Sequence, residues 1–289
     1  MCRKFGIVLL LSTVGAIWAQ QQPYYLQQCP RDEAVINECL RDSGNKLVHY
    51  LQKGIPELDI YEIEPVIIDE IGIVLGSGPD GYRALFRNIQ AFGVSNITVT
   101  NVRSFFICSV KHSSNASEHL PGTRSQLRSI FMNAICILLH EENSDLDSLQ
   151  FQLTCEIPRI RVKAQYRSTG VLILVKASGA GDYWGEYEGV KAKIYFKALA
   201  NEAADGRTYL TTDSVKMDFN VKEIQMGVDN IANGNTVIQA ALNLFINSNS
   251  QELLKEMKPA LRTKLTLVIR NFMDRLFAKI PLDEWINLN

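Results

Sequence analysis

The sequence predicts an α+β fold in which a strongly curved antiparallel β-sheet wraps around a long C-terminal helix. Apolar and polar residues alternate with a period of two over much of residues 60–235, which is typical of strands with one buried face. An apolar stripe with helical spacing then covers residues 250–279. No helical segments alternate with the strands, so a parallel βαβ architecture is not expected.

Residues 1–19 have the layout of a secretory signal peptide, with a basic start, an apolar run over 6–14 and a small residue, Ala19, at the end. The apolar run is too short to span a bilayer, and no later stretch reaches the roughly 20 apolar residues that a membrane helix needs. We therefore expect a secreted, extracellular protein with a single domain over residues 20–289 and no stable membrane insertion.

The composition excludes two broad classes of protein. The chain has 289 residues, of which 46% are hydrophobic and 21% charged, so disorder of the whole chain is not expected. Its formal net charge is -1, which leaves no basic excess to neutralise phosphates. A nucleic-acid partner is therefore not expected.

Loss of the signal peptide removes Cys2 and leaves an odd number of cysteines. The remaining ones are Cys29, Cys39, Cys108, Cys136 and Cys155. At least one thiol therefore stays unpaired within the molecule. A bridge between Cys29 and Cys39 would close a loop of about ten residues and stabilise the fold by about 3 kcal/mol. Asn96 and Asn115 stand in Asn-X-Ser/Thr sequons and are glycosylation candidates.

A first helix is expected over residues 31–53, because apolar residues recur there at helical spacing and Gly54 with Pro56 ends the run. In the strand region, alternation over 149–157 changes phase after Pro158 and continues over 160–166.

The C-terminal helix is expected to run from about residue 250 to 279. Asn249 or Ser250 would cap its start, Pro281 would end it, and Pro259 would kink it or split it. Thirty helical residues span about 45 Å, and a compact chain of this size has a diameter of roughly 48 Å. A helix as long as the molecule is best explained as a spine inside a curved sheet, a shape that can leave a tunnel.

The sequence gives no positive support for catalysis, a metal or a cofactor. Residues 76–81 match G-x-G-x-x-G, but no acidic residue lies between Gly81 and Glu118 to hold a ribose, so we expect a turn there. The histidines of the 107–141 segment, with Cys108 and Cys136, lack metal-ligand spacing. No nucleophile elbow is present and no Ser-His-Asp set can be assembled, so an enzyme is not expected.

Several short blocks, in order along the chain, carry a resemblance to a known family. They are CP at 29–30 with NECL at 37–40 and GIPEL at 54–58; NI at 88–89 with GVSN at 93–96; IPRI at 157–160 with Tyr166 and Gly170; Gly179, Gly181, Gly185 and Gly189-Val190; and NLFIN at 243–247 before FAKIP at 277–281. On these residues the sequence resembles the arthropod takeout and haemolymph juvenile-hormone-binding protein family.

The resemblance implies a secreted carrier that holds small hydrophobic ligands, such as juvenile hormone-like terpenoids or fatty acyl lipids, in an apolar tunnel between helix and sheet. It also implies that Cys29 and Cys39 pair, and it links the chain to circadian rhythm. The best candidates for the tunnel lining are inward residues of the C-terminal helix, which equally fit a plain hydrophobic core. They are Leu261, Leu265, Val268, Phe272 and Leu276.

Residues 107–141 depart from the family pattern, in which the preceding strand passes directly to one like 149–157. We hypothesise that this segment is a gene-model artefact, a retained intron, as against a real surface insertion. A transcript lacking these codons would support the artefact, and a peptide from the segment in purified protein would exclude it.

A second function class stays open beside the carrier. A secreted signalling or interaction protein would act on a receptor, which the sequence does not identify, through its surface, with the tunnel filled or collapsed. An exchangeable lipid in purified protein distinguishes the carrier from this alternative.

Overall fold

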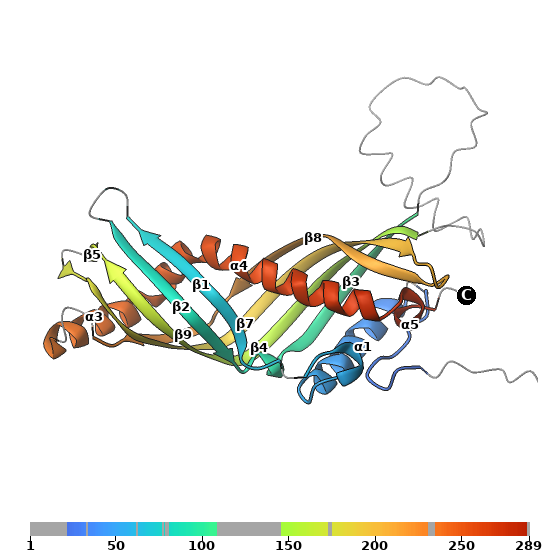
Figure 1. The fold of residues 1–289 in the computed structure, drawn as a ribbon, viewed down its shortest axis with the longest axis horizontal. Helices are drawn as coiled ribbons and strands as arrows, with labels where there is room; N and C mark the ends of the chain where they lie inside the picture. Colours follow the sequence, from blue (N-terminus) through green and yellow to red (C-terminus); the bar gives the residue numbers. More distant parts are fainter. Residues whose placement is uncertain are drawn as a thin grey trace, which may run out of the picture.

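A computed structural model describes residues 22–32, 34–61, 63–76, 78, 81–108, 146–172, 175–230 and 235–287. The expected fold class is confirmed. A curled antiparallel sheet surrounds one side of α4 (Ser250–Lys279), which runs along the length of the molecule (Figure 1). The signal-peptide prediction, the sequon at Asn115 and most of the 107–141 segment lie outside the described residues.

Two strands of 24 residues, β4 (Leu146–Thr169) and β7 (Gly179–Glu202), pair along almost their whole lengths and form the centre of the sheet. The others are β1 (Val66–Leu75), β2 (Tyr82–Phe92), β3 (Thr98–Cys108), β8 (Thr208–Asn220), β9 (Glu223–Val228) and a small pair, β5 (Val171–Leu172) with β6 (Val175–Lys176). Successive halves of β4 pair with β3 and β2, and successive halves of β7 pair with β9 and β8. The sheet therefore consists of two halves joined through β4 and β7.

The two halves meet where Pro158 lies across from Gly189. The register runs from Ile157 opposite Val190 to Arg159 opposite Glu188 and skips the pair between them. Proline has no N–H to donate, and Gly189 has a φ of 60°, which glycine adopts without strain. The phase change predicted at Pro158 is confirmed by the inner face of β4, where Cys155 and Ile157 line the interior before the proline and Ile160 and Val162 line it after.

Helices close both ends of the molecule (Figure 1). The helix α1 (Ile36–Leu51) lies at one end with the short α5 (Leu282–Trp285), and α3 (Thr236–Ser248) lies at the other. Two short 3-10 turns, η1 (Pro56–Leu58) and η2 (Val94–Asn96), complete the elements. The helix α1 starts at Ile36, later than expected, because Asp32 forms a turn before it, with its side chain accepting from the Ala34 N–H and its carbonyl from the Val35 N–H. The helix α3 was not predicted, because no element was assigned from the sequence between the strand region, which ends at 235, and the start of the long helix.

Pro259 lies inside α4 and does not split it, because the helix continues from Ser250 to Lys279, so the expected split is wrong. The proline lies on the exposed side of the helix, where water can satisfy the Lys255 carbonyl that loses its N–H donor. Asn249 occupies the N-cap position of α4, as expected, but its side chain makes no capping bond, and its Nδ2 donates to the Phe245 carbonyl of α3 at 2.9 Å. Asn249 alone joins α3 to α4, and its side chain forms a hydrogen bond with the C-terminal end of α3.

Asparagine side chains on the terminal helices satisfy the edges of the sheet. Asn45 of α1 accepts from the Val99 N–H at 2.8 Å and donates to its carbonyl at 2.9 Å. Asn247 of α3 makes the same pair of bonds with Met226 of β9, at 2.9 and 2.8 Å. A carboxamide offers one donor and one acceptor side like a peptide group, so each asparagine replaces a missing strand.

The sheet meets α4 along two different seams. Toward β8, the Arg262 Nε donates to the Met217 carbonyl at 3.0 Å, and an Nη of Arg270 donates to the Thr212 carbonyl at 2.9 Å. Toward β1, α4 packs against the strand, and no hydrogen bond joins the two among the described residues. The seam between α4 and β1 is therefore held by packing alone.

Substitution of Gly93 by alanine is expected to destabilise the turn between β2 and β3. Gly93 has a φ of 89°, and an added Cβ would overlap the carbonyl oxygen of Arg159. Left-handed strain and this clash together should lower the free energy of unfolding by about 1–3 kcal/mol.

Gly206 provides the matched control, because it also has a positive φ, 77°, but an added Cβ would meet nothing within 4 Å. Urea denaturation of both alanine variants should show the larger loss for Gly93→Ala. Equal losses would show that the approach of Arg159 carries no penalty.

Candidate ligand-binding cavity

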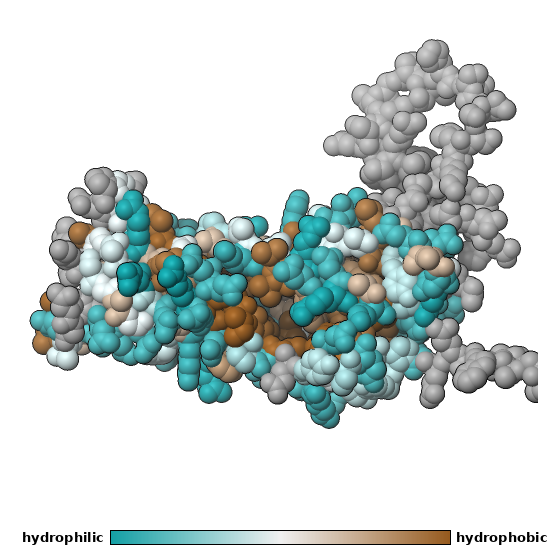
Figure 2. Space-filling model, viewed as in Figure 1, coloured by the Kyte–Doolittle hydropathy of each residue, from teal (hydrophilic) through white to brown (hydrophobic). Residues whose placement is uncertain are grey.

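An internal cavity of about 930 Å³ lies between α4, α1 and the inner face of the sheet. This volume is in the upper part of the range for small-molecule sites, about 300–1,000 Å³. Aliphatic and aromatic side chains from β1, β2, β4, β7, β8 and both helices form nearly all of its wall. Figure 2 shows hydrophobic residues around a hollow near the middle of the face shown.

All five helix residues singled out from the sequence lie on the cavity wall: Leu261, Leu265, Val268, Phe272 and Leu276. They differ in how much each side chain is also buried in the hydrophobic core. Leu276 is 2% exposed and belongs to a buried cluster with Leu51 and Ile280. Val268 lies on the wall and outside the three buried clusters and the residues packed against them. Val268 is therefore the member whose side chain contributes least to the core.

The cavity opens where the segment between η1 and β1 passes α4. Tyr61 and Ile67 line the cavity and are 69% and 53% exposed, so the wall reaches the surface there. From α4, Phe272 and Arg275 line the same cavity. This opening lies along the seam between α4 and β1 that no hydrogen bond closes in the described part of the chain. We call these four residues, with Asp59, the mouth.

Two tyrosine hydroxyls lie on the wall and satisfy each other. Tyr183 and Tyr187 of β7 lean together over Gly185, whose missing side chain leaves the room that they occupy, and share a short hydrogen bond between their hydroxyls. The Tyr183 hydroxyl also lies 3.6 Å from the Met226 sulfur. Burial raises the pKa of Tyr183 well above its ordinary value, and burial also raises the pKa of Tyr187. Both side chains stay neutral, so the wall remains uncharged here.

The raised pKa values of Tyr183 and Tyr187 predict a loss of stability in alkali. Tyrosines of the unfolded chain ionise near pH 10, whereas the buried pair keeps its protons, so the unfolded state is favoured as the pH rises above about 10. Below about pH 9 the pair adds no pH dependence. Urea denaturation at pH 8 and 10.5 should show a smaller alkaline loss for the Tyr183→Phe/Tyr187→Phe double variant. An unchanged loss would contradict the assignment.

Cys155 contributes a free thiol to the wall. It is 2% exposed, and burial raises the pKa of the thiol to about 11. A thiol that stays protonated at neutral pH is a weak nucleophile, so Cys155 acts here as a small apolar side chain. The described residues contain no group of three or more histidine, cysteine or acidic side chains that could hold a metal ion.

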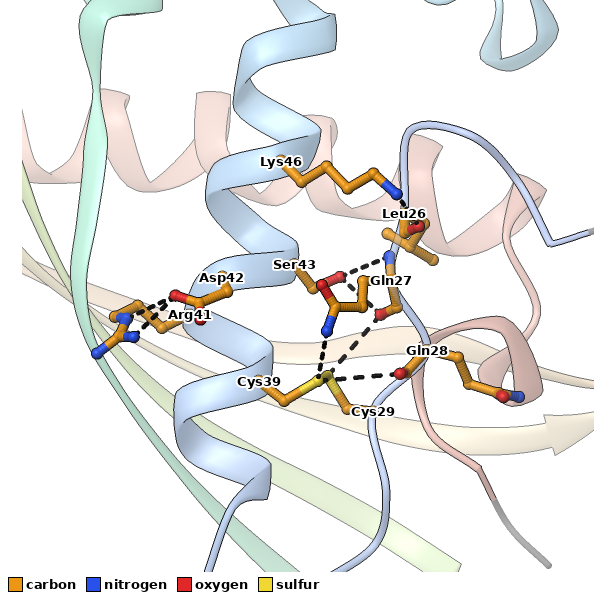
Figure 3. Close-up of a disulfide and its surroundings, with 9 residues drawn as sticks. All are labelled: Leu26, Gln27, Gln28, Cys29, Cys39, Arg41, Asp42, Ser43 and Lys46. Atoms are coloured by element: carbon orange, nitrogen blue, oxygen red, sulfur yellow. Dashed lines mark hydrogen bonds and ion pairs between the residues drawn. A yellow bond between two sulfur atoms is a disulfide. The ribbon is translucent and has the colours of Figure 1, made fainter.

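A disulfide joins Cys29 and Cys39, the pairing that the family resemblance implies. Figure 3 shows that it ties the N-terminal segment to α1, where Ser43 bonds Gln27 and the Lys46 ammonium donates to the Leu26 carbonyl at 2.8 Å. The same segment binds the C-terminus, since the Cys29 N–H donates to the Trp285 carbonyl at 2.9 Å. The disulfide and these hydrogen bonds together hold α1, the N-terminal segment and α5 at the same end of the cavity.

Two further sequence expectations fall on described residues. Asn96 is exposed at the end of η2, so its side chain is accessible, and its glycosylation remains a prediction. The glycines at 76, 78 and 81 lie in the connection from β1 to β2, with the Gly81 N–H donating to the Gly78 carbonyl. A strand follows this connection, as expected for a turn, and a nucleotide-binding loop would be followed by a helix.

Comparison with known protein families identifies the one to which this chain is related. The sequence profile of the haemolymph juvenile hormone binding protein (JHBP) family matches residues 7–114 and 139–287. The chain belongs to the JHBP family. The match omits residues 115–138, which lie inside the segment that departs from the family pattern.

Individual proteins also match this chain, at low sequence identity. A circadian clock-controlled protein, daywake, from Drosophila yakuba is 20% identical over 271 residues, which cover 92% of this chain and 89% of that protein. Daywake from Drosophila melanogaster is 22% identical over 205 residues, 71% of this chain and 79% of that protein. The crystal structure of takeout 1 from Epiphyas postvittana matches with a TM-score of 0.66 at 15% identity, over 91% of this chain and 100% of that one. This last match supports the fold of the JHBP family.

No helix among the described residues combines the length and the uncharged apolar stretch required to cross a membrane.

Proposed function

We propose that this protein is a secreted carrier that binds a small hydrophobic ligand, such as a juvenile hormone-like terpenoid or a fatty acyl lipid, in its internal cavity. The observation that carries the proposal is the cavity itself, about 930 Å³ and lined almost wholly by apolar side chains. Burial of apolar ligand surface there would contribute about 25 cal/mol per Å². Membership of the JHBP family and a disulfide near the N-terminus support a secreted binding protein.

The proposed contact residues on α4 are Leu261, Leu265, Val268, Phe272 and Leu276, which lie on one side of the cavity. The inner face of β4 and β7 faces them across it, with Cys155 and Ile194 on the wall. Such a wall selects a ligand by shape, since one misfitting methylene changes binding by only about 1–3 kcal/mol. We therefore propose selectivity for length and bulk.

Titration of the purified protein with N-phenyl-1-naphthylamine, which fluoresces in apolar surroundings, tests the proposal. Saturable binding of one probe per protein, displaced by fatty acids or terpenoid esters, is the expected result. A probe that does not bind, in protein shown by circular dichroism to be folded, would refute the carrier function.

The alternative, a surface-acting protein, requires a filled or collapsed interior. The open volume favours the carrier over a collapsed interior. An interior filled by a permanently bound molecule would appear in the same titration as protein that takes up no probe until it has been delipidated.

A further inference from the structure

We infer that Arg275 makes the cavity mouth a binding site for an ionised carboxylate, so that the preferred ligand is a long-chain free acid with its head group at the surface. This inference rests on the proposed carrier function and specifies the chemical class of its ligand. Its basis is the presence of charged side chains at the mouth of a cavity whose wall is otherwise almost wholly apolar.

Charged side chains are rare on the cavity wall. Among its described residues only Asp59 and Arg275 carry a charge, and both lie at the mouth. Asp59 is already paired, since its carboxylate lies 2.6 Å from the Lys279 ammonium. Arg275 is exposed, and no ion pair or hydrogen bond to its guanidinium is found among the described residues. Among the described residues, the mouth thus presents one positive charge without a counter-ion.

The neighbours of Arg275 on α4 offer no carboxylate. At three and four residues before and after it stand Phe272, Asn271, Ala278 and Lys279, which are neutral or positive. The nearest acidic residue in sequence, Asp274, points elsewhere, because its carboxylate accepts from the Thr212 N–H of β8 and lies 3.8 Å from Arg270. A counter-ion for Arg275 must therefore come from outside the helix.

The surroundings of Arg275 fit the head of an amphipathic ligand. Phe272, one turn away, lines the apolar cavity, while the exposed side chain of Tyr61 places a phenol at the same mouth. A guanidinium can hold a carboxylate through two parallel N–H bonds, while the alkyl chain extends inward along α4. Neutral esters and alcohols would gain the same apolar burial without this contact. Arg275 also complements the negative end of the α4 dipole, a structural role that predicts no preference for acids.

Competition between palmitic acid and hexadecanol for bound N-phenyl-1-naphthylamine tests the inference. The ratio of the two affinities should favour the acid in the wild type and fall about fivefold in Arg275→Gln, the effect expected of a partly exposed charge pair. Arg275→Glu should lower the ratio further. Lys264→Gln removes a positive charge from an exposed position of the same helix outside the cavity wall, and it should keep the wild-type ratio.

The outcomes separate the inference from the proposed function. Binding of both competitors with the same ratio in wild type and Arg275→Gln would overturn the carboxylate site and leave the carrier intact. An equal fall in Lys264→Gln and Arg275→Gln would also overturn it, since the effect would then come from overall charge. Failure of the probe and both competitors to bind folded wild-type protein would refute the carrier function itself.

Discussion

Replacement of Val268 by tryptophan is expected to weaken ligand binding about ten- to a hundredfold while the protein stays folded. Val268 lies on the cavity wall, so the indole would project into the space that a ligand would occupy. Overpacking costs about 1–3 kcal/mol, and here the cost falls on the complex, because Val268 lies outside the buried clusters. Titration with N-phenyl-1-naphthylamine measures the loss.

The adjacent residue provides a control of the same size. Leu267 is 54% exposed and does not line the cavity, so Leu267→Trp should bind the probe as the wild type does. Unchanged binding by a folded Val268→Trp variant would show that ligand does not lie against the middle of α4.

Replacement of Phe277 by alanine is expected to lower the free energy of unfolding by about 3–5 kcal/mol, the usual effect of removing a buried aromatic ring. Phe277 is 3% exposed, and its ring centroid lies 6.0 Å from that of Phe196 on β7 and 6.4 Å from that of Trp285 on α5. It therefore joins the end of α4 to both the sheet and the C-terminal helix.

Urea denaturation measures this loss, and Leu267→Ala on the exposed side of α4 should change stability by no more than about 0.5 kcal/mol. A loss below about 1 kcal/mol for Phe277→Ala would show that the end of α4 is not anchored at this cluster. Since domains are typically stable by only about 5–15 kcal/mol, the expected loss is a large fraction of the total.

The curved sheet and its helical spine could be predicted because the spacing of apolar residues along the chain indicates both. Alternating residues on β4 gave the inner face, and the break at Pro158 gave the position where the two halves of the sheet join. All five residues chosen from the apolar stripe of α4 lie on the cavity wall, although periodicity alone could not separate Leu276, a core residue, from Val268.

The features missed by the sequence analysis depend on contacts between distant segments. Asn247 satisfies the edge of β9 at Met226, 21 residues away in the sequence, and local periodicity does not identify that partner. Asn249 stands at the predicted N-cap position of α4, but the expected capping bond is absent because its side chain bonds to the preceding helix, which was not expected. The mouth was missed because it combines Tyr61 with Arg275, more than 200 residues apart. The NLFIN block at 243–247 does contain a sequence signal, because two asparagines at helical spacing in an otherwise apolar segment need hydrogen-bond partners.

The edges of the sheet explain where a ligand could pass. Side chains of α1 satisfy β3, those of α3 satisfy β9, and those of α4 satisfy β8. The seam between β1 and α4 lacks such bonds within the described residues and lies beside the mouth. Separation of these two packed surfaces breaks no hydrogen bond between them, so we propose this seam as the route by which a ligand enters.

Mass spectrometry of an organic-solvent extract of protein purified from its secreting tissue tests whether the cavity holds an exchangeable hydrophobic ligand. We expect about one apolar molecule per protein, replaced by deuterated palmitic acid after incubation with an excess. An empty cavity that takes up no deuterated acid, or a bound molecule that never exchanges, would contradict the carrier function.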